Sequence, residues 1–299
     1  MHLLIPHASA LDDAARQALG SLALPNLGAL LARLTPTDTW GSDAYSPHPP
    51  HHLALAALHG QAEPSVAAWA AADPQRAWAE LTPVHLAVGT DGVDLLPPAA
   101  LRLSDAESAD LATALQELWS AADGWQWRSL SATRWLVGHA QALDGLHAAS
   151  IERAAGRPIE PWLPESRVLR RWQNEAQMRL HHHPVNTARE ARGAHAVNSV
   201  WISGIGRANG LNPAQGSTGA PPDLTVDARL TEPLLNGDLA AWAEAWQQLD
   251  AGPLAQPLTT LTLCGERLAQ RFEAKPQSLL ARLQRRWRQA EPAQILEAL

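Results

Sequence analysis

The stretch NEAQMRLHHHPVNTAREARGAHAVNSVWISGIG, residues 174–206, decides most of what the sequence says about the fold. It starts inside an amphipathic helix that the spacing of apolar residues predicts over 166–180. The helix must end by His183, because a proline follows and the residue before a proline avoids helical geometry. A buried strand is predicted over 197–202, before a glycine-containing turn at 204–206. A long helix leading through a polar connection into a buried strand is typical of an α/β protein.

The segment upstream of this helix has the pattern of a small α+β unit. Alternating apolar residues over 84–88 and 93–96, separated by Asp91-Gly92, predict a β-hairpin. Residues 104–107, Ser-Asp-Ala-Glu, form a capping box that starts the next helix. A further strand is predicted over 134–137.

These elements predict a core interrupted by an insertion. We expect the core to combine residues 1–77 and 151–299, and the inserted α+β domain to cover 78–150. The short apolar strand at 3–5 should share a sheet with the strand at 197–202.

The composition is that of a globular protein outside the secretory pathway. The chain has 299 residues, of which 46% are hydrophobic and 18% charged, and its net charge is -7. An acidic chain is a poor electrostatic match for nucleic acid or an anionic membrane surface. Its single cysteine, Cys264, cannot form an internal disulfide, which favours a reducing, cytoplasmic compartment. The absence of an apolar run of about 18 residues argues against a membrane-spanning helix.

The densest polar cluster surrounds Pro184, with His183, Asn186, Arg189 and Asn198 near it in sequence. Forked guanidinium and neutral amide donors suit phosphate or carboxylate oxygens, so a ligand pocket is one interpretation. The alternative is a solvated polar helix end. A metal site on His181 and His183 is disfavoured, because no further ligands follow at helical spacing.

The turn at 204–206 begins a Gly-x-Gly-x-x-x-Gly run, which differs from the dinucleotide-binding spacing. No helix pattern follows it, so a Rossmann site is disfavoured. A turn at the carboxyl end of a strand is nevertheless where α/β proteins commonly bind ligands.

The C-terminal helix expected near residues 280–287 has a basic face. It is either a solvated surface or a docking surface for an acidic protein partner. The arginines of this face are Arg282, Arg285, Arg286 and Arg288.

Residues 174–206 resemble the signature of the archaeal-type, cofactor-independent phosphoglycerate mutases, a family of the alkaline phosphatase superfamily. The matching elements are His183-Pro184-Val185-Asn186, Arg189, Gly193, Asn198 and Trp201-Ile202-Ser203-Gly204-Ile205-Gly206. The segment 84–137, ending in a strand that carries Arg134, resembles the inserted domain of that family. Pro25-Asn26-Leu27 resembles a helix start shared across the superfamily. The chain is most similar to a bacterial group of shortened relatives, the RpfE-type regulatory proteins.

The resemblance implies a three-layer, alkaline-phosphatase-like α/β core with a small inserted α+β domain. It also implies a set of candidate residues for binding a phosphorylated or carboxylated small molecule. These are Arg134, His183, Asn186, Arg189, Asn198, Gly204, Gly206 and Arg207.

The departures from the family concern its two divalent metals and its Ser or Thr nucleophile. Where the family's first strand ends in Asp-Gly, this chain has His7 after Pro6, with Asp12 out of register. The nucleophile position falls near His51-His52, and the last strand leads to Cys264-Gly265-Glu266 instead of an Asp-His pair. The nearest hydroxyls to the nucleophile position belong to Ser42 and Ser46.

These departures predict a pseudoenzyme that retains no metal cofactor and acts as a regulatory or ligand-sensing protein, with no catalytic residue identified. The alternative is a divergent metal-dependent phosphatase or mutase that has rebuilt its site from histidines. Its candidate ligands are His7, His48, His51, His52 and His183. A third interpretation is a scaffold that binds an acidic partner through the arginines of the C-terminal helix.

Overall fold

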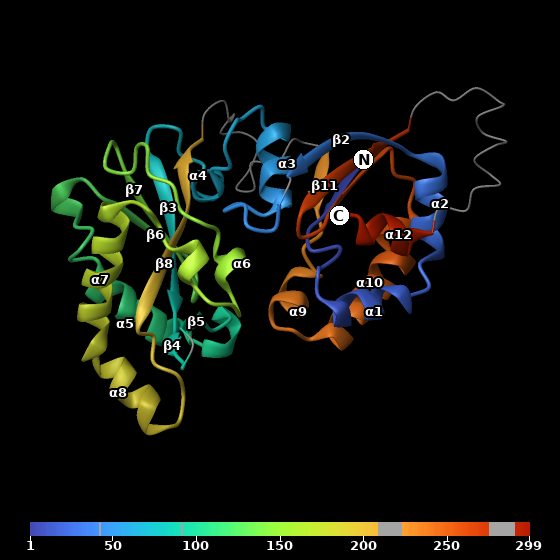
Figure 1. Cartoon of the computed structure of the whole chain (residues 1–299). Coiled ribbons are helices and arrows are strands. Elements are labelled where there is room, and N and C mark those ends of the chain that lie inside the picture. Colours follow the sequence, from blue (N-terminus) through green and yellow to red (C-terminus); the bar gives the residue numbers. More distant parts are fainter. Residues whose placement is uncertain (42, 91, 209–222, 275–290) are drawn as a thin grey trace. The chain divides into compact units, whose positions relative to one another are not determined.

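The computed structural model describes residues 1–41, 43–90, 92–208, 223–274 and 291–299 (Figure 1). The chain divides into two compact units. Unit 1 combines Met1–Leu58 with Ala220–Leu299, and unit 2 is His59–Gly219.

Unit 1 is built on a mixed five-stranded sheet with the order β2-β11-β10-β1-β9. Its strands are β1 (His2–Ile5), β2 (Thr35–Gly41), β9 (Leu224–Val226), β10 (Thr260–Cys264) and β11 (Leu268–Glu273). The central strand β1 runs parallel to both β10 and β9, whereas β11 is antiparallel to β10 and to β2. Because β1 and β10 are parallel neighbours, the residues that follow them emerge at the same edge of the sheet.

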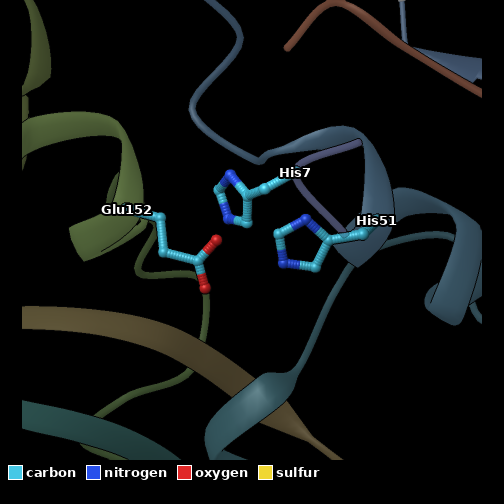
Figure 2. A group of neighbouring side chains, drawn as sticks. All are labelled: His7, His51 and Glu152. Carbon is cyan, nitrogen blue, oxygen red and sulfur yellow. The ribbon is translucent and has the colours of Figure 1, made fainter. Parts of the chain in front are cut away.

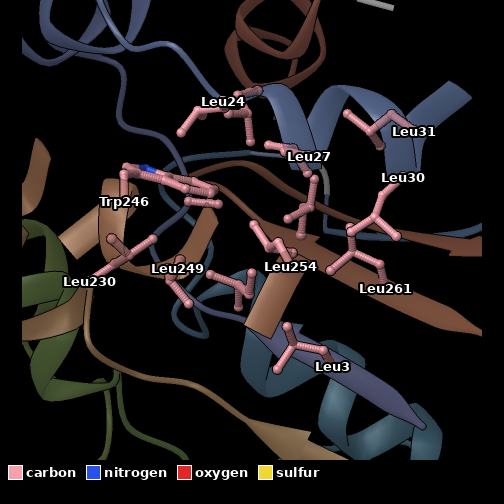
Figure 3. Packing of buried hydrophobic residues seen from close by; sticks show 14 of the residues in the cluster. Leu3, Leu24, Leu27, Leu30, Leu31, Leu230, Trp246, Leu249, Leu254 and Leu261 are labelled. Carbon is pink, nitrogen blue, oxygen red and sulfur yellow. The ribbon is translucent and has the colours of Figure 1, made fainter. Parts of the chain in front are cut away.

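Helices cover both faces of this sheet. They are α1 (Asp13–Gly20), α2 (Pro25–Arg33), α3 (Pro50–Leu58), α9 (Thr231–Leu235), α10 (Leu239–Ala251) and α12 (Pro292–Glu297). Leu3 of β1 and Leu261 of β10 pack on one face with residues of α1, α2, α10 and α12 (Figure 3). The alternate residues Leu4 and Cys264 face the other way and pack with Ala54 of α3. Unit 1 therefore has three layers.

The start of α2 is held by a residue from α10. The N-cap position, Leu24, makes no side-chain cap. Instead the buried carboxylate of Asp250 accepts the backbone N–H of Leu27 at 2.8 Å and that of Asn26 at 3.2 Å. The Asn26 amide in turn donates to the Asp250 carbonyl at 3.0 Å. The Pro25-Asn26-Leu27 motif is thus the point at which α2 and α10 are joined.

Unit 2 is built on an antiparallel four-stranded sheet with the order β6-β7-β3-β8. Its strands are β3 (Ala77–Val84), β6 (Gln126–Ser131), β7 (Arg134–His139) and β8 (Ser199–Arg207), and a hairpin joins β4 (Leu86–Val88) to β5 (Val93–Leu95). Its helices are α4 (Val66–Ala71), α5 (Asp105–Leu115), α6 (Ile151–Ala154), α7 (Arg167–His181) and α8 (Pro184–Ala191). Helices α5 and α7 share a core with one face of this sheet, while α4 packs on Trp78 and Leu136 of the other face.

The α/β class with a three-layer core, expected from the sequence, is confirmed, but the α+β unit is not small, since unit 2 contains more residues than unit 1. The unit expected over 78–150 extends over His59–Gly219. The prediction that the strand at 3–5 shares a sheet with the strand at 197–202 is wrong. Strand β8 pairs with β3, for example Ile202 with Leu81, and so belongs to the four-stranded sheet together with α7.

Most predictions of single helices, strands and caps are confirmed by the structure. The hairpin, the helix over 166–180 and the strand at 134–137 are confirmed as β4–β5, α7 and β7. The capping box is present, since the Glu107 N–H donates to Ser104 Oγ at 3.3 Å and the Ser104 N–H donates to Glu107 Oε2 at 3.0 Å. The sequence pattern does not predict helix α8, because Pro184 ends the helix before it, but a proline also suits the first turn of a new helix. In the described part of the chain, no helix has the length and apolar character needed to cross a membrane.

Candidate functional site

The asparagine of the His-Pro-Val-Asn motif lies inside unit 2. Asn186 in α8 is only 2% exposed. Its amide donates to the Leu180 and Val197 carbonyls, both at 2.8 Å, and its Oδ1 accepts the Val197 N–H at 2.8 Å. Asn186 therefore ties the end of α7 to the segment before β8.

The arginine of the same motif is fully buried. Arg189 Nε donates to the His195 carbonyl at 2.8 Å, and Nη1 donates to Glu107 Oε1 at 3.0 Å. Its Nη2 donates to the Leu101 carbonyl, and Arg192 reaches Glu107 Oε1 from the surface. Burial raises the pKa of Glu107, but the hydrogen bonds it accepts outweigh this effect and bring the pKa to about 2. The donors are the Ser104 N–H and hydroxyl and the two arginines.

Asn198 and His183 also bond to backbone. The Asn198 side chain accepts the Leu86 N–H at 2.8 Å and donates to the Leu86 carbonyl at 2.9 Å, as a strand partner would. His183 is the N-cap of α8, where its Nδ1 accepts the Val185 N–H at 3.3 Å.

The turn expected at residues 204–206 is absent, because strand β8 continues to Arg207, and the two glycines lie within this strand against α4 and its N-cap Ser65. Gly204 has a left-handed φ of +62°, and a Cβ there would lie 3.1 Å from the Ala67 nitrogen. A Cβ on Gly206 would lie 2.1 Å from Ser65 Oγ. Close approach of helix and strand thus requires glycine at both positions.

The two remaining arginines make ion pairs. Arg134 donates to both carboxylate oxygens of Glu80, from Nε at 3.0 Å and Nη2 at 2.6 Å, and this hydrogen bonding raises the pKa of Arg134. Arg207 Nε donates to Asp144 Oδ1 at 2.9 Å.

The structure therefore brings Asn186, Arg189 and Asn198 together around one segment, residues 195–198. Arg134 and Arg207 bond to acidic residues elsewhere in unit 2. Binding of a small molecule by these residues stays a prediction.

The acidic partners of these arginines could not be recognised from the sequence. Glu107 was identified only as part of a capping box, and Glu80 was not singled out. Arg189 and Glu107 are 82 positions apart, and no sequence pattern links them.

A second group of polar residues lies in unit 1, where β1 ends and α3 begins. The ring centroids of His7 and His51 are 5.2 Å apart, and those of His51 and His52 are 4.4 Å apart. Figure 2 shows the His7 and His51 rings next to each other, and Glu152, also drawn there, belongs to unit 2. His51 and His52 are buried. His7 has a φ of 55°, a left-handed conformation that costs a residue with a side chain about 1–2 kcal/mol. Such strain is concentrated at functional sites.

The residues after β10 meet those after β1. The Ala8 N–H donates to the Cys264 carbonyl at 2.8 Å, and the Leu11 N–H donates to Glu266 Oε2 at 3.0 Å. Residue 7 after β1, residues 51–52 at the start of α3 and residues 264–266 at the end of β10 are thus neighbours in unit 1. A Cβ on Gly265 would lie 2.4 Å from Ser9 Oγ, so the chain is tightly packed there.

The carboxylates and the thiol in or near these stretches have structural roles. Asp12 Oδ1 caps α1 by accepting the Ala15 N–H at 2.8 Å, and Glu266 accepts the Leu11 N–H. Burial raises the pKa of the Cys264 thiol well above its ordinary value, so the thiol stays protonated. Ser46 is half-buried in a turn, and Ser42 lies outside the described residues, as do the arginines of the expected C-terminal helix.

Comparison with known proteins gives distant likenesses of fold. No protein-family model matches the chain, and no curated protein matches it in sequence. A cofactor-independent phosphoglycerate mutase from Thermoplasma acidophilum is similar in structure, with a TM-score of 0.38 and 15% identity over 93% of this chain and 91% of the other. The PH0037 protein from Pyrococcus horikoshii is similar with a TM-score of 0.48 and 10% identity, over 91% of this chain and 87% of the other.

Proposed function

We propose that this protein is a non-catalytic, regulatory or ligand-sensing relative of metal-dependent phosphotransferases. The observation that carries the proposal is the chemistry of the edge of the unit 1 sheet where β1 and β10 end. The positions at which the family resemblance implies metal ligands and a nucleophile hold His7, His51-His52 and Cys264-Gly265-Glu266.

The charge of the side chains at this edge is too small for two metal ions. Two divalent cations close together repel each other, and a site for both needs several carboxylates. In this chain the carboxylate of Asp12 caps α1, that of Glu266 accepts the Leu11 N–H, and the Cys264 thiol is protonated. Imidazoles are neutral ligands and do not offset this repulsion. These residues do not fit a two-metal centre.

A turnover assay tests the loss of phosphotransfer. Purified protein is incubated with 3-phosphoglycerate, and separately with p-nitrophenyl phosphate, in the presence of manganese, magnesium or zinc. We expect no turnover above the rate without protein. Robust turnover that disappears on Ser42→Ala or Ser46→Ala would contradict the proposal, because a hydroxyl nucleophile would then be present.

The ligand-sensing part of the proposal has a separate test. Thermal unfolding is followed with phosphate, 3-phosphoglycerate and a non-phosphorylated carboxylate at millimolar concentration. Stabilisation that is lost in Arg134→Gln would support binding of an anionic metabolite. No stabilisation by any of the three would leave the motif around Asn186 and Arg189 with its structural role alone.

A second candidate, a divergent metal-dependent phosphatase or mutase, is favoured by the group formed by His7, His51 and His52. Two adjacent imidazole rings and a strained backbone at His7 are features of a metal site. Elemental analysis of the purified protein distinguishes the candidates. One equivalent of zinc that is lost in His7→Ala and His51→Ala, together with metal-dependent turnover, would favour the enzyme.

A further inference from the structure

Two histidines lie next to each other in unit 2, away from the groups discussed so far. His85 follows β3 and His195 precedes β8, and Val84 and Ser199 of these strands are register partners. The two ring centroids are 4.9 Å apart with an interplanar angle of 44°. His195 is exposed and His85 is half-buried, so solvent reaches the pair.

The tautomer of His85 follows from its hydrogen bond. Its Nδ1 lies 2.7 Å from the Ala196 carbonyl oxygen. A carbonyl oxygen only accepts, so Nδ1 carries the hydrogen. In the neutral ring the lone pair is then on Nε2. Histidine ligands of metals are commonly held in this way, with one nitrogen donating to a carbonyl and the other available to the metal.

The backbone around both histidines is fixed by the side chains of the signature motif. Asn198 makes two hydrogen bonds to Leu86, the residue after His85. Arg189 donates to the His195 carbonyl, and Asn186 bonds to both polar groups of the Val197 backbone. Three buried or half-buried side chains thus fix the backbone that carries the two imidazoles, and a rigid backbone is part of the support that a metal site requires.

We propose that His85 and His195 bind one divalent transition-metal ion, with water at the remaining coordination positions. A metal 2.0–2.1 Å from an imidazole nitrogen lies about 3.2 Å from the ring centre, so two rings at 90–110° around it are about 4.5–5.2 Å apart. The observed 4.9 Å falls within this range. Imidazole ligands select zinc, copper or nickel over magnesium and calcium, which prefer oxygen.

This inference is independent of the proposed function, since it concerns other residues. Isothermal titration with zinc and with copper is the test, carried out in a His181→Gln/His182→Gln background. That background removes a second histidine pair, whose ring centroids are 4.3 Å apart. We expect His85→Ala and His195→Ala each to remove one equivalent of bound metal. The matched control is His147→Gln at an exposed histidine, which should leave the binding unchanged.

The His195→Ala protein should fold normally, because the His195 ring is exposed and makes no hydrogen bond to another described residue. Unchanged stoichiometry and affinity in a folded His195→Ala protein would overturn the proposal. Stabilisation of the background protein by inorganic phosphate but not by zinc, lost in His195→Ala, would also overturn it and would assign an anion to the pair. Histidine-selective ¹⁵N NMR should show the zinc-induced shift at His85 Nε2.

Discussion

Replacing Arg189 with methionine tests whether the motif arginine supports the fold of unit 2. Methionine keeps an unbranched apolar stem but is shorter than arginine, and it removes the charge and all donors. The variant loses the bonds to Glu107 Oε1 at 3.0 Å and to the His195 carbonyl at 2.8 Å, as well as the bond to the Leu101 carbonyl. Two backbone carbonyls then lose a charged donor in a site where the arginine was 0% exposed.

The expected magnitude follows from these losses. A hydrogen bond to a charged group contributes about 1.5–3 kcal/mol, and removing one partner of a buried ion pair costs about 3–5 kcal/mol. Glu107 keeps Arg192 and Ser104 as partners, and the methionine recovers some apolar burial. We therefore expect Arg189→Met to lower the free energy of unfolding of unit 2 by about 3–5 kcal/mol.

Arg192→Met is the matched control, because Arg192 reaches the same carboxylate oxygen with a side chain that is 53% exposed. An exposed pair contributes at most about 1 kcal/mol. Denaturant unfolding followed by tryptophan fluorescence measures both variants, since Trp119 and Trp135 are buried in the same core as α5 and α7. Equal and small losses in the two variants would refute the structural role of Arg189.

The remaining predictions concern single contacts. Asp250→Ala should lower the free energy of unfolding by about 2–4 kcal/mol, because it leaves the start of α2 without its cap. Denaturant unfolding measures this loss, and a value under about 1 kcal/mol would contradict the prediction. Gly206→Ala should lower the free energy of unfolding by about 1–3 kcal/mol, because its Cβ would meet Ser65. Gly20→Ala has open space around it and should not destabilise the protein, so only the first variant should have a lower melting temperature. Burial, Arg271 and the N-terminal charge lower the pKa of His2 from 6.5 to about 4. The stability that His2 contributes should therefore be complete above pH 6.5 and fall by at most about 3 kcal/mol towards pH 4. In His2→Gln this part of the pH dependence should vanish, and an unchanged profile would show that other groups cause it.

Several elements of the fold were predictable because their signals are local. The period of apolar residues identified α7, the alternation around Asp91-Gly92 identified the β4–β5 hairpin, and the Ser104–Glu107 capping box identified the start of α5. Each of these depends on residues within a few positions of one another. Helix α8 was missed because Pro184 is compatible both with ending one helix and with beginning the next.

The candidate residues were predictable only as a cluster in sequence. Asn186, Arg189 and Asn198 do converge on one segment, but the sequence could not show that their donors bond to backbone and to Glu107. The proximity of His7 to His51 depends on how α3 packs on the sheet of unit 1, and that of His85 to His195 depends on the pairing of β3 with β8.

The sequence by itself determined the α/β class and the local elements, because composition and short-range patterns carry that information. Only the tertiary structure decided that β8 pairs with β3 instead of joining the sheet of β1. A strand's apolar pattern says that it is buried but not which partner it pairs with. The same holds for polar side chains. Whether a buried arginine binds a ligand or a carbonyl depends on which groups, distant in sequence, the packed core places within hydrogen-bonding distance.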